Sequence, residues 1–342
     1  MRRKKYVIHQ ERFHFAQLEI QRKARIDLSN LDAVTFGEAM VMFTADEPGP
    51  FHEVIHYTSG LAGAEMNVAI GLARLGLRSG WVSKVGNDSF GKLILRRLEK
   101  EGVDINQVQI DEHFPTGFQL KSKVLDGDPE IQYFRKGSAA SFMGKGDFPE
   151  EYFLGAAHVH MTGIPPAISE QTREYAGYVL HCMKRHGRTI SFDPNLRPAL
   201  WKSQAEMIDV VNKFAFEANY VLPGIGEGYI LTGYREPRDI ASFYLEKGVE
   251  LVIIKLGEAG AYYKTAYEEG KVSSFPVEKT VDTVGAGDGF AVGVISALIE
   301  KCSIVEAVQR GNAIGALAVQ SPGDYDGYPS RKQLQQFMQN KK

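Results

Sequence analysis

A short run in the last quarter of the sequence, Gly285-Ala286-Gly287-Asp288, combines bare backbone with one carboxylate, ahead of a long apolar helical pattern. The free N–H groups of a first helical turn and the helix dipole bind anions, and glycine lets a phosphate approach the backbone closely. Asp288 would repel a phosphate if holding it were its only role. We therefore interpret Asp288 as a general base that takes a hydroxyl proton, while the adjacent amides hold charge on a phosphoryl group. The alternative, an aspartate that only complements the helix dipole, stays open.

Two other glycine-rich nucleotide motifs fit this sequence less well. A dinucleotide fingerprint needs G-x-G-x-x-G in an early βαβ unit, but here the order is G-A-G-D-G, late in the chain. A Walker A loop needs G-x-x-x-x-G-K-[ST], which neither "FGKLIL" nor "MGKGDF" supplies. The turn is therefore interpreted as a cradle for the transferred phosphoryl group itself.

Strand and helix patterns alternate from Leu31 onward, which predicts an α/β fold with a mostly parallel sheet and helices on both faces. The expected strands are 31–43, 80–86, 158–164, 189–195, 219–224 and 250–257, with one more ending near Thr283. The expected helices are 65–76, 88–102, 169–187, 237–248 and one that continues from the glycine turn to Glu300. The expected N-caps are Asp88 and Ser169, and the expected stops are Gly76, Gly102, Gly187 and Gly248.

Two segments interrupt this alternation. Within 113–139, "TGFQLKSKVL" and "EIQYFRKGS" alternate as strands around "DGDP", which predicts an antiparallel hairpin. The other insert is 44–62, which follows the first expected strand. Both leave the core near its first strands, so we expect them to form a small β lid over the sheet edge.

Charge separates residues 1–30 from the remainder. This segment carries eight Lys/Arg and three Asp/Glu, a net +5 that leaves −7 elsewhere in a chain of net charge −2. No aromatic-basic pattern accompanies the charge, so we expect a non-functional extension outside the fold and no nucleic-acid partner. No apolar run resembles a secretory signal or is long enough to span a membrane, and the two cysteines suit a reducing compartment. We therefore expect a cytoplasmic protein whose residues 31–340 form a single domain.

The glycine turn and an earlier segment together resemble a known family. "DTVGAGDGF" is similar to the C-terminal signature of the ribokinase-like, or PfkB, carbohydrate kinases. "GLAGAEMNVAIGLARLG" followed by "VSKVGNDSFGKLILRRLEKEGV" is similar to their N-terminal signature, and the likeness runs in order from Leu31 to Gln339. The resemblance implies a ribokinase-like fold in which Asp288 is the catalytic base and Gly285, Ala286 and Gly287 form the anion hole.

The same resemblance implies an ATP site and a magnesium requirement. "KLGEAGAYY" is similar to the strand and turn beside the nucleotide phosphates and ribose, which implies roles for Lys255, Gly257 and Gly260. "GNAIGALAVQSPG" is similar to the segment that flanks adenine, with counterparts at Asn312, Ala316 and Gly323. Many relatives carry Asn-x-x-Glu where this chain has Gly224 to Glu227, so Glu227 is the one retained metal candidate.

The expected substrate follows from resemblance to one branch of this family. "TFGEAMVMF", "YFRKGSAAS" and "SFDPNLRPALW" resemble segments of kinases that phosphorylate 2-keto-3-deoxygluconate. A sugar acid carries a carboxylate, for which guanidinium groups are preferred partners, and Arg135 and Arg197 are expected to face the cleft. The resemblance adds Gly63, Asn67 and Tyr133 as sugar-acid contacts, and Gln119 where some relatives have tyrosine.

These expectations describe an ATP- and Mg²⁺-dependent kinase that converts 2-keto-3-deoxygluconate into 2-keto-3-deoxy-6-phosphogluconate. A fructokinase or other sugar kinase of the family is the first alternative, and a non-catalytic sugar-acid sensor is the second. The exposed edge of the lid hairpin favours a homo-oligomer formed through the lid.

Overall fold

The computed structural model describes residues 31–124 and 129–340, so the basic segment 1–30 lies outside the described residues. An 8-stranded sheet crosses the molecule in the order β14-β13-β12-β11-β10-β9-β1-β4. Its pairings are parallel except at β12–β13 and β13–β14. The strands are β1 (Leu31–Phe36), β4 (Ser79–Val82), β9 (Ala156–Thr162), β10 (Thr189–Asp193), β11 (Tyr220–Val221), β12 (Leu251–Lys255), β13 (Ala261–Lys264) and β14 (Glu269–Val272).

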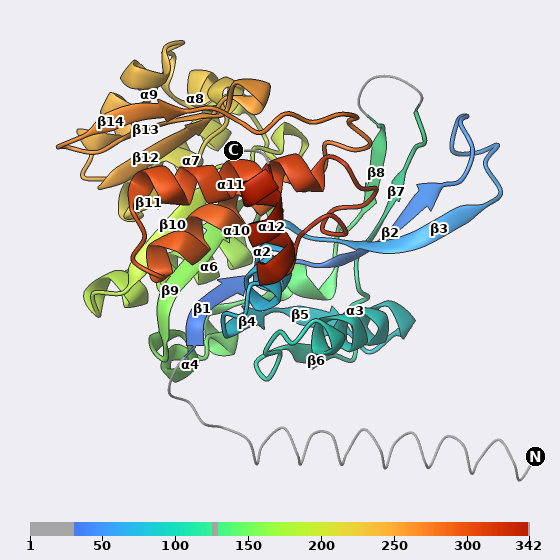
Figure 1. Cartoon of the computed structure of the whole chain (residues 1–342). Helices are drawn as coiled ribbons and strands as arrows, with labels where there is room; N and C mark the ends of the chain where they lie inside the picture. The colour runs from blue at the N-terminus through green and yellow to red at the C-terminus, as the bar shows by residue number, and fades with distance from the viewer. Residues whose placement is uncertain (1–30, 125–128, 341–342) are drawn as a thin grey trace, which may run out of the picture.

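Helices cover both faces of this sheet, as the strand and helix alternation predicts. The buried apolar side chains form two clusters. Neighbouring residues of β12 belong to different clusters, Ile253 to the first and Ile254 to the second. This is the two-residue period of a strand buried on both faces. The first cluster takes residues from α2 (Ala64–Arg74), α3 (Ser89–Lys100), α10 (Ala286–Ile299), α11 (Ile304–Ala318) and α12 (Arg331–Asn340). The second takes them from α4 (Glu150–Leu154), α6 (Glu170–Arg185), α7 (Gln204–Glu217), α8 (Ile225–Thr232) and α9 (Pro237–Leu245), and the short α5 (Pro165–Ile168) contacts α6. Figure 1 shows α10 and α11 crossing in front of the sheet.

The lid forms a separate 4-stranded sheet in the order β3-β2-β7-β8, which stands to one side of the main sheet in Figure 1. Its strands are β2 (Met40–Ala45), β3 (Tyr57–Ala62), β7 (Phe118–Lys121) and β8 (Ile131–Phe134). The predicted antiparallel hairpin is confirmed by the β7–β8 pairing, although most of its "DGDP" turn lies outside the described residues. Phe90 of α3 packs against Phe118 at a ring distance of 5.8 Å, which attaches the lid to the body. A 2-stranded sheet of β5 (Lys84–Gly86) and β6 (Gln109–Asp111) lies nearby.

Two of the expected strands each divide in two. The segment 31–43 supplies β1 to the main sheet and β2 to the lid, so the lid begins at Met40 rather than at residue 44. The segment 80–86 divides between β4 and β5. The two breaks touch, because the Ser83 hydroxyl donates to the Gly37 carbonyl (2.6 Å) and the Gly37 amide donates to Val82 O (3.2 Å). These bonds close the end of β1 and turn the chain out toward the lid.

The expected helix boundaries are confirmed by their caps. Asp88 accepts from the Gly91 amide (2.8 Å) and Ser169 from the Thr172 amide (3.0 Å). Positive φ angles follow the four helices at the expected stops, Gly76, Gly102, Gly187 and Gly248. The strand expected to end near Thr283 is wrong: β14 ends at Val272, and the chain from there to the turn is irregular.

Candidate active site

Three distant segments meet at the carboxylate of Asp288. It lies in the first turn of α10 and is only 8% exposed. Asn67 of α2 donates its side-chain amide to one carboxylate oxygen, Oδ2 (2.9 Å). Asn195, two residues beyond β10, donates to the other, Oδ1 (3.2 Å). The carboxylate therefore sits where the two halves of the domain meet, beside the expected anion hole.

The glycine turn has the geometry of an anion-binding helix start. Gly285 is left-handed (φ 79°), and a Cβ there would lie 1.7 Å from the carbonyl oxygen of Asp324, so only glycine fits. The Tyr328 hydroxyl donates to Gly285 O (2.6 Å) and fixes the turn. The Gly289 amide donates a helical hydrogen bond to Gly285 O (2.9 Å). The amides of Gly287 and Asp288 come before it in the first turn, where backbone N–H groups have no intrahelical partner.

Lys255 adds a positive charge next to this turn. Its ammonium binds Asp193 Oδ2 (2.6 Å) and would lie 3.5 Å from a Cβ placed on Gly287. Burial alone would lower the pKa of Lys255, but the carboxylates of Asp193 and Glu227 outweigh it and hold the pKa above its usual value. The ammonium therefore stays charged beside the anion hole.

The surroundings make Asp288 more basic than an ordinary aspartate. Burial, the largest effect, raises its pKa, and the hydrogen bonds from Asn67 and Asn195 and the charges of Arg197 and Lys255 only partly oppose it. A raised pKa suits a group that must take a proton from a hydroxyl near neutral pH. The arrangement of a basic carboxylate, a helix N-terminus and an ammonium group can support phosphoryl transfer.

Four of the residues expected to bind the sugar acid lie at the start of α2 or on the lid, and among these four Asn67 contacts Asp288 directly. Gly63 begins α2, and a Cβ there would lie 2.8 Å from Glu38 O. Gln119 is buried on β7, opposite Tyr133 of β8, which is 38% exposed. Asn67 is buried, and its Oδ1 has no hydrogen-bond partner among the described residues. Asn67 thus contacts the base through its amide and keeps a free acceptor beside it.

The two arginines expected to bind a carboxylate differ in their partners. Arg135 is buried and pairs with the buried Glu38 through Nε (2.7 Å) and Nη2 (2.6 Å). Arg197 is half-buried and donates to the carbonyls of Asn195 (3.4 Å) and Leu196 (3.0 Å). Within the described residues Arg197 has no carboxylate within ion-pair distance. Its charge also acts on Asp288, so it lies close to the base.

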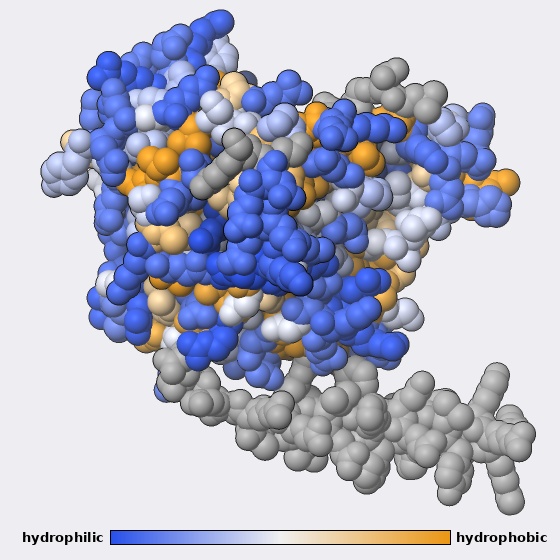
Figure 2. All heavy atoms as spheres, viewed as in Figure 1, coloured by the Kyte–Doolittle hydropathy of each residue, from blue (hydrophilic) through white to orange (hydrophobic). Residues whose placement is uncertain are grey.

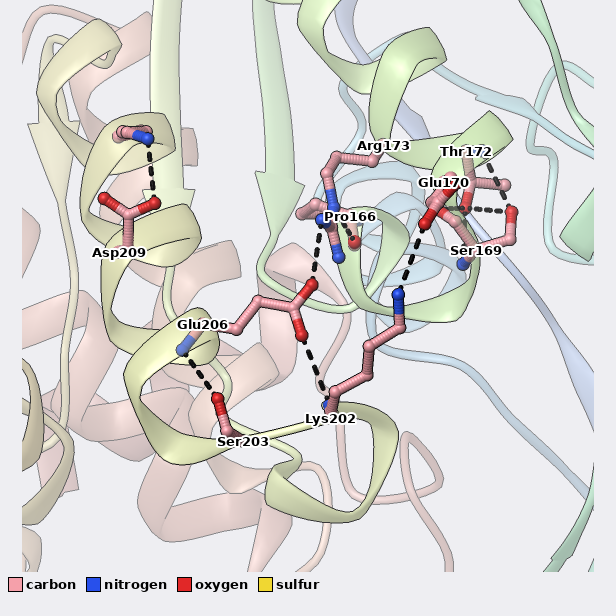
Figure 3. Close-up of polar contacts among 10 residues, drawn as sticks. Pro166, Ser169, Glu170, Thr172, Arg173, Lys202, Ser203, Glu206 and Asp209 are labelled. Atoms are coloured by element: carbon pink, nitrogen blue, oxygen red, sulfur yellow. Dashed lines mark hydrogen bonds and ion pairs between the residues drawn. The ribbon is translucent and has the colours of Figure 1, made fainter.

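The loop that carries Asn195 and Arg197 is anchored at its far end. Figure 3 shows that the Glu206 carboxylate of α7 accepts hydrogen bonds from the Arg173 guanidinium of α6 (3.2 Å) and from the Lys202 backbone amide (3.3 Å). The Lys202 ammonium reaches Glu170 (3.4 Å), and the Arg173 guanidinium lies over the Trp201 ring (5.1 Å). These contacts join the end of the loop, at Trp201 and Lys202, to α6 and α7.

The residues expected to bind nucleotide lie on α11, in the segment after it and in the turn after β12. Asn312 of α11 donates to the carbonyls of Val272 and Ser273 (3.1 Å each), which ties α11 to the end of β14. Gly323 has a left-handed φ of 86° and precedes Asp324, the residue in contact with Gly285. Ala316 is buried on α11. Gly257 (φ 61°) and Gly260 (φ 90°) form the turn after β12, where a Cβ on Gly260 would meet Val272 O at 2.0 Å.

Glu227 has a structural task as well as its expected metal role. Its Oε2 accepts from the Gly224 amide (2.7 Å) at the start of α8, and its Oε1 accepts from the Leu196 amide (2.8 Å). A carboxylate oxygen keeps a further lone pair after one such bond. No cluster of three or more His, Cys, Asp or Glu side chains within 31–124 and 129–340 could hold a metal ion. The remaining acceptor capacity of Glu227 fits a role toward water bound to an ion, because Mg²⁺ usually keeps several of its waters.

Several residues of this centre were not identified from the sequence. Asp193 and Asn195 stand at the carboxyl end of the strand expected at 189–195, and that position was the available signal. Glu65 is fully buried in the N-terminal signature, and no pattern of spacing marks it as polar core. Glu38 was noted only as a branch feature, whereas the structure makes it the partner of Arg135.

Comparisons with known proteins agree with this geometry. The pfkB family carbohydrate kinase profile matches residues 30–331. A Bacillus subtilis (strain 168) protein named 2-dehydro-3-deoxygluconokinase is 55% identical over 309 residues, covering 90% of this chain and 95% of that protein. The Arabidopsis thaliana protein named probable fructokinase-5 is 29% identical over 317 residues, covering 90% and 97%.

The fold is also found among solved structures. The crystal structure of a putative Ribokinase II from E. coli in complex with ATP and Mg²⁺ has a TM-score of 0.85 at 30% identity, covering 91% of this chain and 100% of that chain. No helix within the described part of the chain has the length and apolar character needed to cross a membrane. Fold, glycine turn and matched signatures lead to one assignment: this chain belongs to the pfkB family of carbohydrate kinases.

Proposed function

We propose that this carbohydrate kinase transfers the γ-phosphoryl group of ATP to the 6-hydroxyl of 2-keto-3-deoxygluconate, also called 2-dehydro-3-deoxygluconate. The observation that carries the proposal is the meeting of a buried, basic Asp288 with a helix N-terminus and the Lys255 ammonium. The choice of sugar acid is supported by the 55% identity to the Bacillus subtilis relative, against 29% for the fructokinase relative. The family alone would leave the substrate open.

In the proposed reaction Asp288 takes the proton of the 6-hydroxyl as that oxygen forms a bond to the γ-phosphorus. The bond from this phosphorus to the β,γ-bridging oxygen breaks, and ADP leaves with the electron pair. The amides of Gly285, Ala286 and Gly287 and the Lys255 ammonium would stabilise the negative charge on the transferred group, and for this the Ala286 amide would leave the Thr283 carbonyl (3.4 Å). The lid sheet covers the sugar and excludes water, which could otherwise accept the phosphoryl group.

The remaining site assignments form part of the same proposal. Gly63, Asn67, Gln119, Tyr133, Arg135 and Arg197 would contact the sugar acid, and Lys255, Gly257, Gly260, Asn312, Ala316 and Gly323 would bind ATP. Glu227 would help to hold Mg²⁺ through bound water. When bound, this ion screens the triphosphate charge. Support comes from the ATP and Mg²⁺ complex of the E. coli neighbour.

We also propose a cytoplasmic location and a homo-oligomer formed through the lid. Large apolar side chains of the lid are exposed, among them Ile55 (79%), Val124 (40%) and Phe134 (42%). Figure 2 shows hydrophobic residues at the surface of the lid, while the face over α12 is hydrophilic. β3 and β8 are the edge strands of the lid sheet, and open edges favour pairing between chains. Sedimentation of the wild type at micromolar concentration as a monomer would contradict this part of the proposal.

The experiment that tests the function measures ADP release with 2-keto-3-deoxygluconate, fructose and ribose side by side, in the wild type and in Asp288→Asn. We expect turnover selective for the keto acid, and a loss of about 10²- to 10⁴-fold in the variant, the range for removal of a general base. Preference for fructose would replace the substrate but keep the kinase. Binding of the keto acid without ADP release would favour a sensor, and equal activity in the variant would refute the mechanism.

A further inference from the structure

Asp288 is held at both carboxylate oxygens by side-chain amides from different parts of the chain. Asn67 Nδ2 lies 2.9 Å from Oδ2, and Asn195 Nδ2 lies 3.2 Å from Oδ1. Two donors on the two oxygens prevent the carboxylate from rotating about its Cβ–Cγ bond. The Asn67 amide was expected at the sugar, whereas Asn195 has no assigned role.

The backbone of Asn195 is itself fixed from both sides. Its φ of 41° is left-handed, a conformation that asparagine tolerates better than most residues. The Asn195 amide donates to Asp193 Oδ1 (3.2 Å), and the next amide, that of Leu196, donates to Glu227 Oε1 (2.8 Å). At the end of the same loop, the Lys202 amide donates to Glu206 of α7 (3.3 Å), which also accepts from Arg173 of α6 (3.2 Å) (Figure 3). The direction of the Asn195 side chain toward Asp288 is therefore built into the fold.

We propose that Asn195 is a positioning residue for phosphoryl transfer, which acts by orienting the Asp288 carboxylate and stabilising its charged form. The proposal rests on the proposed function, because it takes Asp288 as the base. Asn195 has no reacting atom of its own. Misplacement of a catalytic group by about 1 Å can cost about 10²-fold in rate, so a single lost donor is expected to be visible in kcat.

Charged and titratable groups surround Asp288 on every side. The two cations, Arg197 and Lys255, favour its charged form, and burial opposes it. The acidic or phenolic groups that interact with it come from α2, β10 and the segment after α11: Glu65, Asp193, Asp324 and Tyr328. Asn195 is one of only two hydrogen-bond donors from side chains of the described residues that favour the carboxylate form. Its removal should therefore raise the pKa of the base and leave less of the active form at a given pH.

Two variants of the full chain test the role of Asn195. Asn195→Gly removes the amide but keeps the left-handed backbone accessible. Asn195→Asp keeps the shape but, once ionised, offers only acceptors to Oδ1. The matched control is Asn87→Ala, since Asn87 is exposed and its side-chain amide binds Glu112, remote from the site.

We expect Asn195→Gly to lower kcat about 10- to 100-fold, with the KM values for ATP and keto acid within about threefold of wild type. The acid limb of kcat against pH should move to higher pH. Asn195→Asp should lose more activity than Asn195→Gly at neutral pH, because it places a second carboxylate beside Oδ1. Asn87→Ala should match the wild type in all these measurements.

The inference is overturned if Asn195→Gly keeps wild-type kcat and pH profile, or if Asn195→Asp is as active as wild type. A fall in melting temperature with raised KM and an unmoved acid limb would show a structural role only, and would also overturn it. Asp288→Asn distinguishes a failure of the positioning role from a failure of the proposed function. If that variant is inactive while Asn195→Gly is unaffected, only the positioning role fails. If the wild type releases no ADP, the proposed function and this inference fail together.

Discussion

Replacing Glu65 by glutamine should change how the stability of this protein depends on pH. Glu65 is fully buried on α2, and burial raises the pKa of its carboxyl from 4.5 to about 7. Thr162 donates to Oε1, but Oε2 has no hydrogen-bond partner among the described residues. Gly37 makes room for this oxygen, since a Cβ there would lie 2.5 Å from it. The Glu65 carboxyl is therefore buried where its ionised form is unfavourable.

The magnitude follows from the pKa difference between the folded and unfolded chains. Below about pH 4.5 the carboxyl is protonated in both, and its contribution to stability is fully present. As the pH rises from 4.5 to about 7, the unfolded chain loses this proton first, so the free energy of unfolding falls. The total loss is about 3 kcal/mol and is constant above pH 7. Glutamine has the same shape and no proton to lose, so Glu65→Gln should escape this loss.

The assay is urea unfolding of wild type and Glu65→Gln at pH 5 and pH 8. The stability of the variant relative to wild type should rise by about 2.5 kcal/mol between these pH values. Asp193 and Asp324, whose pKa values burial also raises to about 7, are present in both proteins and cancel in the difference. The matched control is Glu101→Gln: Arg74 holds the pKa of Glu101 below 4.5, so its relative stability should stay constant over this window. A pH-independent or falling difference for Glu65→Gln would refute the reasoning.

Three further predictions concern the turn, the lid and the N-terminal segment. Gly285→Ala should lose at least tenfold in kcat, measured by ADP release, because its Cβ would meet the Asp324 carbonyl at 1.7 Å in a left-handed backbone. Wild-type rates in that variant would mean that the turn adapts. Lys121→Met should destabilise the protein by about 3 kcal/mol in urea unfolding, since it leaves the largely buried Asp282 without its ion-pair partner. An unchanged unfolding midpoint would show that the pair contributes nothing. Deleting residues 1–30 should leave kcat and melting temperature nearly unchanged, and a large loss of either would contradict the view that this segment is dispensable.

Much of the fold follows from local patterns. Caps such as Asp88 and Ser169 satisfy their own helix within three residues, so the sequence alone is enough to place them. The break in the first expected strand does not follow in this way. Gly37 turns the chain because its backbone binds Ser83 and Val82, and Glu38 at the same bend pairs with Arg135, 97 residues away. Gly37 and Glu38 interrupt the apolar run at this point, but the partners that turn the chain there are distant in sequence, so local pattern alone does not predict the bend.

The same distinction separates the predictable and unpredictable parts of the site. The glycine turn and Asp288 are adjacent in sequence, and the chemistry of a helix N-terminus links them without further information. The partners of Asp288 are 221 and 93 residues away, at Asn67 and Asn195. Short elements are predictable in place but not in length, since the strand expected at 219–224 is present as β11, of only Tyr220 and Val221. The long-range contacts of Asp288 therefore needed the three-dimensional structure.

The partners of the two arginines bear on how a sugar acid would be held. The pair of Arg135 with Glu38 carries no net charge, so its long-range attraction for a substrate carboxylate is largely cancelled. Within the described residues Arg197 donates to two backbone carbonyls and forms no ion pair, and its positive charge acts on the nearby Asp288. The guanidinium of Arg135 still has a rigid direction, because Glu38 fixes it and it lies 5.7 Å from the Tyr133 ring. In the proposed complex Arg197 would therefore attract the carboxylate, and Arg135 would define its orientation.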